Sequence, residues 1–217
     1  MSKLGKPPKT SKQEILDSAG RLFKVHGYDG TMLQMIADEL GVTVPAITYY
    51  FKYKYMILAT LFRDMFMMKY EYVRAHLTED FNYYLYYCIV TISAFREIMK
   101  REGNWSLFYH KDHVKYWLDE NMAGIERRYR LITDDFHQGF TDDEVRVAAI
   151  FDVGSKLHLF EEFKKGDTFV NAEKFSYYEV YTIGIFSRLD EGTIQRNIRR
   201  AYDFLDSHTL PTIFMME

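Results

Sequence analysis

Apolar side chains recur along most of the chain at the three- to four-residue spacing of an amphipathic helix. The segment that begins near residue 11 is typical, because its apolar residues form one stripe: Ile15, Leu16, Ala19, Leu22 and Phe23. Proline occurs only at positions 7, 8, 45 and 211, so residues 46–210 contain no strong helix breaker. Alternating strand patterns bounded by two-residue turns are almost absent. The pattern predicts an all-α fold.

The expected helix boundaries are marked by caps and glycines. Capping boxes are predicted at three helix starts, namely at Ser11 with Glu14, Thr31 with Gln34, and Thr141 with Glu144. Glycines that suit helix ends occur at positions 27, 41, 103, 139 and 166. The predicted helices span residues 11–26, 32–40, 44–51, 54–77, 80–101, 104–111, 114–138, 141–165, 172–189 and 191–207.

Charge is distributed unevenly, although the whole chain has a formal net charge of only -3. Residues 1–60 carry 8 basic and 5 acidic side chains, whereas residues 61–217 carry 20 basic and 26 acidic ones. This asymmetry separates a basic N-terminal part, which includes a lysine-rich arm, from an acidic body. We expect two domains, over residues 1–53 and 54–217, and expect any nucleic-acid binding to be confined to the first.

The second and third predicted helices form a helix-turn-helix pattern. The second helix ends at Gly41, and after Val42 the hydroxyl of Thr43 can cap a short third helix. Ile47 and Phe51 hold that third helix from behind, so its opposite face can enter a DNA major groove about 12 Å wide. That opposite face consists of Val44, Pro45, Thr48 and Tyr49.

From Ile15 to Leu58 the sequence resembles the tetracycline-repressor (TetR) family of bacterial transcription regulators. The resemblance covers about a fifth of the chain and rests on residues that keep the family's order and spacing: Ala19, Leu22, Phe23, Gly27-Tyr28 with Thr31, Ile36-Ala37, Gly41-Val42-Thr43, Ile47, Tyr50-Phe51-Lys52, Lys54 and Ile57-Leu58. It implies a three-helix DNA-binding domain followed by a divergent helical domain that binds an effector and forms a homodimer.

By the same resemblance, individual residues are expected to contact double-stranded operator DNA. Thr31, Thr43, Tyr50 and Lys54 correspond to phosphate contacts, and Val44, Pro45, Thr48 and Tyr49 correspond to residues that face bases. The chain departs from the family at Thr48, where tyrosine is usual, and at Tyr49, where histidine is usual. Without Arg or Asn on this face, two-bond recognition of guanine or adenine is excluded, so thymine methyl contacts and DNA shape should contribute more.

The body contains a concentration of aromatic residues that suits a ligand pocket. Six of the 15 residues from Phe81 to Phe95 are aromatic, which exceeds one helix face. We expect a small, largely apolar effector, with ordinary core packing as the alternative for each pocket residue. The expected pocket residues are Tyr84, Tyr87, Cys88, Trp105, Phe108, Trp117 and Met122.

Two late helices are expected to form the homodimer interface, since in the family such a pair meets its symmetry mate in a four-helix bundle. The candidates are the helices predicted over residues 141–165 and 172–189, where small residues would let backbones approach closely. The expected interface residues are Ala148, Phe151, Ser155, Tyr177, Tyr181, Gly184 and Arg188.

Other chemistry finds little support in the sequence. The lone cysteine and the absence of a signal-peptide core favour a cytoplasmic protein, and the longest charge-free run, 15 residues, is too short for a membrane span. His110, Asp112 and His113 resemble half a metal site, but recognised metal, hydrolase and nucleotide motifs are absent, so we expect no metal, no cofactor and no enzyme activity. Charge runs such as Glu126-Arg127-Arg128 are interpreted as solvated helix faces.

The sequence therefore predicts an effector-responsive DNA-binding transcription regulator. We expect a repressor that a small, largely apolar ligand releases from a palindromic operator. The alternative is a helical ligand carrier or enzyme in which the helix-turn-helix bundle is vestigial.

Overall fold

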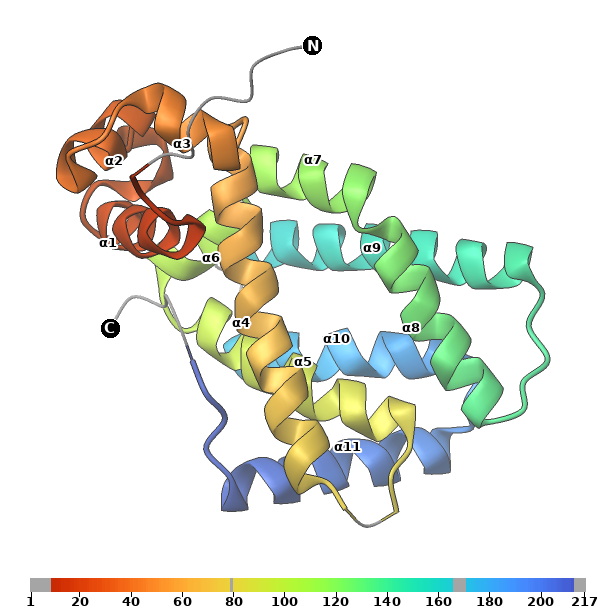
Figure 1. Cartoon of the computed structure of the whole chain (residues 1–217). Coiled ribbons are helices and arrows are strands. Elements are labelled where there is room, and N and C mark those ends of the chain that lie inside the picture. Colours follow the sequence, from red (N-terminus) through yellow and green to blue (C-terminus); the bar gives the residue numbers. More distant parts are fainter. Residues whose placement is uncertain (1–8, 79, 166–170, 213–217) are drawn as a thin grey trace.

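A computed structural model of the chain describes residues 9–78, 80–165 and 171–212, with the exception of the side chains at positions 116, 117, 119, 120 and 172. Every regular element in these ranges is a helix, which confirms the all-α prediction (Figure 1). The helices are α1 (Lys12–Gly30), α2 (Leu33–Leu40), α3 (Val44–Tyr50), α4 (Lys54–His76), α5 (Tyr83–Met99), α6 (Glu102–Phe108), α7 (Lys111–Glu120), α8 (Met122–Asp135), α9 (Asp142–Lys164), α10 (Ala172–Phe186) and α11 (Glu191–Ser207).

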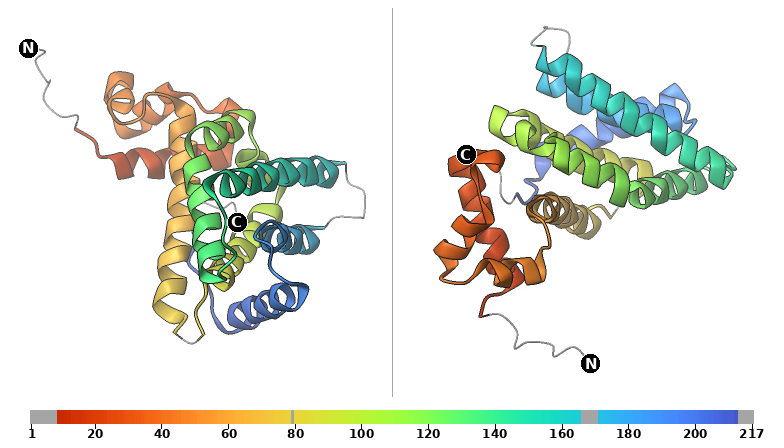
Figure 2. Two further views of the ribbon diagram at one scale, coloured as in Figure 1. Left: turned by 90° about the vertical axis from the view of Figure 1, so that its right-hand side faces the viewer. Right: turned by 90° about the horizontal axis from the view of Figure 1, so that it is seen from above.

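Helices α1 to α3 form a head at one end of the molecule, and α4 runs from the head along the body (Figure 1). Seen from above, α4 lies beside the head (Figure 2, right), and α1 contacts both α4 and α6 of the body. One hydrophobic core joins the two parts, since Phe23 and Ile47 of the head belong to the same buried cluster as Ile57, Phe62 and Phe108. The domain boundary at residue 53 stays a prediction, because apolar packing is continuous across it.

Helix α5 is the central helix of the body and packs against α4, α8, α10 and α11. Twelve of its 17 residues are buried, as expected for a helix that is apolar on more than one face. Its start is fixed by Asn82, whose side-chain oxygen accepts a hydrogen bond from the Leu85 amide at 2.8 Å. The helix therefore begins at residue 83, three residues later than predicted.

Two of the three predicted capping boxes are present. The pairs Ser11/Glu14 and Thr141/Glu144 each exchange hydrogen bonds between side chains and backbone at the start of α1 and α9. The prediction at Thr31 is wrong, because α2 starts only at Leu33.

Only some of the glycines that were predicted to end helices do so. Gly27 and Gly41 adopt positive φ angles of 70° and 64°, which interrupt or end a helix as expected. Gly139 also has a positive φ angle, of 66°, but α8 already ends at Asp135, and the left-handed residue just past its end is His137, with a φ of 53°. The prediction for Gly103 is wrong, since it lies inside the first turn of α6. Gly166 lies outside the described residues.

The single helix predicted over residues 114–138 is two helices, α7 and α8, with a break at Asn121. The two halves pack on different partners, because α7 contacts α4 and α6 whereas α8 contacts α5 and α9. A straight helix cannot serve both sets of neighbours. The apolar period alone does not reveal this change of partner.

Gly184 offers a test of how closely α10, α11 and α5 pack. A β-carbon at this position would lie 2.7 Å from both Ile194 Cγ1 and the Tyr84 hydroxyl oxygen. We expect Gly184→Ala to lower the free energy of unfolding by about 1–3 kcal/mol through overpacking, measured by urea denaturation. Gly30→Ala is the control, because a β-carbon there makes only an ordinary 3.5 Å contact with His26 Cβ. Equal stability of the two variants would contradict the packing at Gly184.

Candidate nucleic-acid interface and internal cavity

The helix-turn-helix of the head has the predicted geometry. Gly41 makes the turn after α2 at a φ of 64°, and Ile47 of α3 is fully buried against the head. The opposite face of α3 is accessible: Tyr49 is 59% exposed, and Thr43 and Pro45 are exposed as well. Val44 and Thr48 are half-buried at its edges. This face carries the residues that were expected to meet DNA bases.

Two predicted phosphate contacts do not fit the structure. The side chain of Thr31 is fully buried, and its hydroxyl donates a hydrogen bond to the Gly27 carbonyl at 2.8 Å. The Tyr50 hydroxyl donates its single proton to the Thr10 carbonyl at 3.0 Å, so it has none for a phosphate oxygen, which can only accept. We therefore remove both hydroxyls from the candidate interface. Thr43 stays in it, since its exposed hydroxyl makes no capping bond within the described residues.

Lys54, at the first position of α4, has a structural partner that the sequence did not indicate. Its ammonium donates hydrogen bonds to the carbonyls of Tyr28 at 2.7 Å and Thr31 at 2.9 Å, and it lies 4.1 Å from the centre of the Tyr28 ring. Burial lowers the pKa of this group, although Asp29 and Asp112 act in the opposite direction. An ammonium has three donors, so one more hydrogen bond is open to it.

The same tyrosine connects the head to the body. The Tyr28 hydroxyl donates to the Asp112 carboxylate of α7 at 3.3 Å, and its ring packs on His110 with centroids 4.4 Å apart. His110 Nε2 in turn lies 3.2 Å from the Asp29 carboxylate. His110 and Asp112, first considered as part of a metal site, thus hold the α6–α7 turn against the head.

A cavity of about 310 Å³ lies beside this junction, where His113 of α7 forms part of its wall, and it is partly open because the exposed side chains of Arg63 and Met67 also line it. Its apolar wall is mainly aromatic and comes from α4, α5 and α6: Phe62, Phe66, Tyr70, Tyr87, Phe95 and Phe108. The volume falls at the lower end of the range for small-molecule sites, roughly 300–1,000 Å³.

Of the seven residues predicted for a ligand pocket, Tyr87 and Phe108 line this cavity. Tyr84, Cys88, Trp105 and Met122 do not line this cavity. Tyr84 and Cys88 are buried, and the Tyr84 hydroxyl donates to the Val180 carbonyl of α10. Trp105 packs on Phe160 and faces a separate groove, and Met122 packs against the second core cluster. The side chain of Trp117 lies outside the described residues.

His113 is a polar group on the cavity wall close to the head. Its Nδ1 lies 2.5 Å from the Phe108 carbonyl, and burial lowers its pKa to about 4. The ring is therefore neutral near pH 7, with its proton on Nδ1, and Nε2 is left as an acceptor. Within the described part of the chain, no group of three or more His, Cys, Asp or Glu side chains could hold a metal ion.

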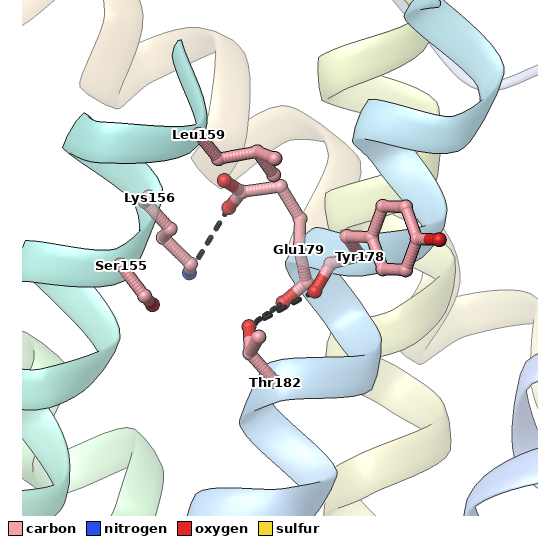
Figure 3. A pocket seen from close by; sticks show the side chains of 6 residues that line it. All are labelled: Ser155, Lys156, Leu159, Tyr178, Glu179 and Thr182. Carbon is pink, nitrogen blue, oxygen red and sulfur yellow. Dashed lines mark hydrogen bonds and ion pairs between the residues drawn. The ribbon is translucent and has the colours of Figure 1, made fainter. Parts of the chain in front are cut away.

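Arg128 of α8 and Lys156 of α9 form part of the far wall of the cavity, and they belong to a cluster of four buried charges that is completed by Asp152 of α9 and Glu179 of α10. One oxygen of Asp152 accepts from Arg128 at 2.5 Å and lies 3.1 Å from the Lys156 ammonium. The same ammonium is 3.1 Å from the Glu179 carboxylate, an ion pair across the α9–α10 contact (Figure 3). The two cations therefore stand side by side, with a carboxylate against each.

Burial acts in opposite directions on the pKa values of Glu179 and Arg128, because it disfavours the charged form of each side chain. Burial raises the pKa of Glu179 to about 7, although Lys156 beside it acts in the opposite direction. For Arg128 burial would lower the pKa, but the Asp152 carboxylate together with Tyr129, Tyr70 and Tyr87 outweighs burial and raises the pKa above its usual value. Arg128 thus stays charged, and Glu179 is the member of the cluster that takes up a proton near neutral pH.

Three of the residues predicted for the dimer interface on α10 have partners within the protomer. The hydroxyls of Tyr177 and Tyr181 bond to Gln195 and Glu191 of α11, and Gly184 is buried against α11 and α5. Gly184 is buried and Tyr177 and Tyr181 are half-buried, so these residues contribute to the packing of the protomer. On α9, Ala148 is also buried in the core.

A different apolar surface is exposed where α9 and α10 lie side by side (Figure 1). We call it the α9–α10 stripe, and it consists of Val147, Ile150, Phe151, Ile185 and Phe186. Phe151, which was predicted for the interface, is 59% exposed and packs on Phe186. Ser155 and Arg188 flank the stripe, half-buried and exposed respectively.

The sequence interpretation missed the charged cavity wall. Arg128 was assigned to a solvated run, but its side chain is only 12% exposed. A pattern in α9 could have revealed the cluster, because Asp152 and Lys156 fall in the same helical register as the apolar core residues Val145, Ala149 and Phe160. Charges at core positions require buried partners.

The exposed α3 face and the all-helical body define a helix-turn-helix DNA-binding protein, and comparisons with known proteins agree. The family model described as "Bacterial regulatory proteins, tetR family" matches residues 15–61. Over these residues the chain is similar to the tetR family of bacterial regulatory proteins, and this similarity supports a DNA-binding transcription regulator. No curated protein sequence matches significantly.

Solved structures of such regulators share the fold. RolR, solved without ligand, superimposes with a TM-score of 0.54 at 14% identity, covering 93% of this chain and 100% of RolR. SmeT, the repressor of a Stenotrophomonas maltophilia multidrug efflux pump, gives a TM-score of 0.51 at 16% identity over 82% of this chain and 90% of its own. A variant of TetR from Acinetobacter baumannii AYE, in complex with minocycline, gives 0.50 at 16% identity over 83% and 98%. No helix among the described residues combines the length and hydropathy of a membrane span.

The raised pKa of Glu179 predicts an unusual pH dependence of stability. The native carboxyl holds its proton up to about pH 7, whereas an ordinary glutamate loses it near 4.5, so the native state binds more protons in that window. The free energy of unfolding should therefore fall as the pH rises through it. In urea denaturation at a series of pH values, Glu179→Gln should remove on the order of 1–3 kcal/mol of this decline. Superimposable pH profiles for the two proteins would contradict the assignment.

Proposed function

We propose that this protein is a homodimeric transcriptional repressor that binds a palindromic operator and is released from it by a small molecule held in the internal cavity. One observation carries the proposal: α4 begins beside the helix-turn-helix and also forms a wall of the cavity. A ligand that favours one tilt of this helix necessarily disfavours another, which changes the placement of α3.

The head supplies what DNA recognition requires. Tyr49, Pro45 and Thr43 present an accessible face on a short helix that its buried side holds rigidly. We propose that Val44, Pro45, Thr48 and Tyr49 face the bases and that Thr43 contacts a phosphate. We further propose that the third donor of Lys54 contacts a phosphate while its other two stay on Tyr28 and Thr31.

A homodimer is supported by the α9–α10 stripe. Exposed apolar surface of this kind is costly unless another molecule covers it. In a two-fold dimer the stripe would meet its own copy, and the two recognition helices could reach successive major grooves about 34 to 36 Å apart.

Selection from random-sequence duplex DNA tests the proposal as a whole. It should enrich an imperfect inverted repeat, and failure to enrich any sequence would contradict operator binding.

The salt dependence of operator binding tests the role of Lys54. Each phosphate that is neutralised contributes a slope of about -0.9 to the logarithm of affinity against the logarithm of salt concentration. With two copies in a dimer, Lys54→Met should therefore reduce the slope by about 2 units on the selected duplex. Lys24→Met, which removes the same charge from an exposed position on α1, should leave the slope unchanged. Weaker binding of Lys54→Met with the wild-type slope would mean that Lys54 acts only within the head.

Sedimentation equilibrium tests the dimer surface. Phe151→Glu places a charge at the centre of the α9–α10 stripe. In a two-fold dimer it removes two buried phenylalanines from the interface, one from each protomer. At about 1.5–3 kcal/mol for each, dimerisation should weaken by roughly 100-fold or more. Val25→Glu is the control, because Val25 is 74% exposed but lies on α1, away from the stripe. A wild-type association constant for Phe151→Glu would contradict this interface.

A further inference from the structure

The charged wall of the cavity is asymmetric. Arg128 and Lys156 line the cavity, whereas their partners Asp152 and Glu179 are not among its lining residues. No described side chain that lines it is a carboxylate. A molecule inside therefore meets two adjacent cations, and the negative charges stand behind them.

The buried cluster is also incompletely satisfied by hydrogen bonds. Within the described residues, Nε of Arg128, Oδ1 of Asp152 and Oε1 of Glu179 have no hydrogen-bond partner, although all three atoms are shielded from solvent. Buried polar atoms in this state are destabilising, and they are rare in proteins except where another molecule or a function accounts for them. Nε of Arg128 is the donor among these atoms, so an acceptor delivered from the cavity side would satisfy it, whereas the carboxylate oxygens of Asp152 and Glu179 require donors.

The remaining residues of the cavity wall indicate which other chemical groups the ligand contains. Rings of α4, α5 and α6 form the wall nearer the head, and the Arg128 guanidinium lies 5.9 Å from the Tyr87 ring. A volume of about 310 Å³ suits a single ring with a short side chain. His113 adds one neutral acceptor at the head end.

We propose that the cavity binds a small aromatic carboxylic acid, with its carboxylate between Arg128 and Lys156 and its ring among the aromatic residues of α4, α5 and α6. This inference rests on the proposed function, since it names the chemical class of the effector. The carboxylate accepts hydrogen bonds from both cations and shares them with Asp152. Protonation of Glu179 would leave Lys156 freer to face the ligand, which supports the assignment.

Calorimetric titration of the full-length, DNA-free protein tests this with matched pairs that differ in charge but hardly in shape. Benzoate is compared with benzamide, and phenylacetate with phenylacetamide. A charge-assisted hydrogen bond contributes enough that each acid should bind about tenfold or more tightly than its amide. Equal affinities, tighter binding of the amides, or no detectable binding of either acid would overturn the proposal.

Variants locate the charge preference. Lys156→Gln alone leaves Glu179 unpaired and can destabilise the fold, so it is combined with Glu179→Gln, which removes one charge of each sign. The double variant should lose about tenfold in benzoate affinity and keep its benzamide affinity, whereas Glu179→Gln alone should bind benzoate more tightly. A purely structural role of the cluster would lower the affinity for both ligands together.

Arg63, the other cation on the cavity wall, is the matched control. It pairs with Asp64 and is 55% exposed, so Arg63→Gln should keep the preference for acids. Loss of that preference in Arg63→Gln would overturn the placement of the carboxylate. The titration contains no DNA, so its result does not depend on whether the protein binds an operator. If the protein binds an operator but has equal affinity for the acids and the amides, the proposed ligand class is wrong and the proposed DNA-binding function is unaffected.

Discussion

The continuity of the apolar core from the head through α4 into the body is the constraint on which the rest of the molecule depends. Phe23 and Ile47 of the head share a buried cluster with Phe62 and Phe108, and the latter two also line the cavity. Close-packed interiors respond to a change in one wall by moving as units, because voids and overlaps are both costly. The cavity therefore cannot change shape without affecting the support of the helix-turn-helix.

Hydrogen bonds add a second connection between the cavity wall and the head. Lys54 binds the carbonyls of Tyr28 and Thr31, and the Tyr28 hydroxyl reaches Asp112 on α7, one residue before the cavity-lining His113. A movement of α7 or of the start of α4 thus alters the segment that leads into α2. Arg128 and Lys156 lie at the other end of the same cavity, and Lys156 with its partner Glu179 also lines a separate pocket between α9 and α10.

The sequence predicted those features that local patterns determine. The order of the head helices, the turn at Gly41 and the enclosed helix α5 all follow from apolar spacing and glycine placement, and all are present. Features that depend on a choice between partners were not predictable in this way. The tyrosines of α10 suit either a second copy or α11, and only the fold shows that α11 takes them. Arg128 is missed for the same reason, because its partner Asp152 lies 24 residues further along the chain.

The central claim, that one rigid path links the cavity to the DNA-binding face, is tested most directly by measuring ligand affinity with and without operator. Benzoate, or a tighter-binding aromatic acid, is titrated into the free protein and into its complex with the selected duplex. Coupling between linked sites is commonly about 1 to 3 kcal/mol and must be reciprocal. We predict that operator weakens ligand binding roughly 5-fold to 150-fold, and that ligand weakens operator binding by the same factor. Equal ligand affinity in the two titrations would contradict the account.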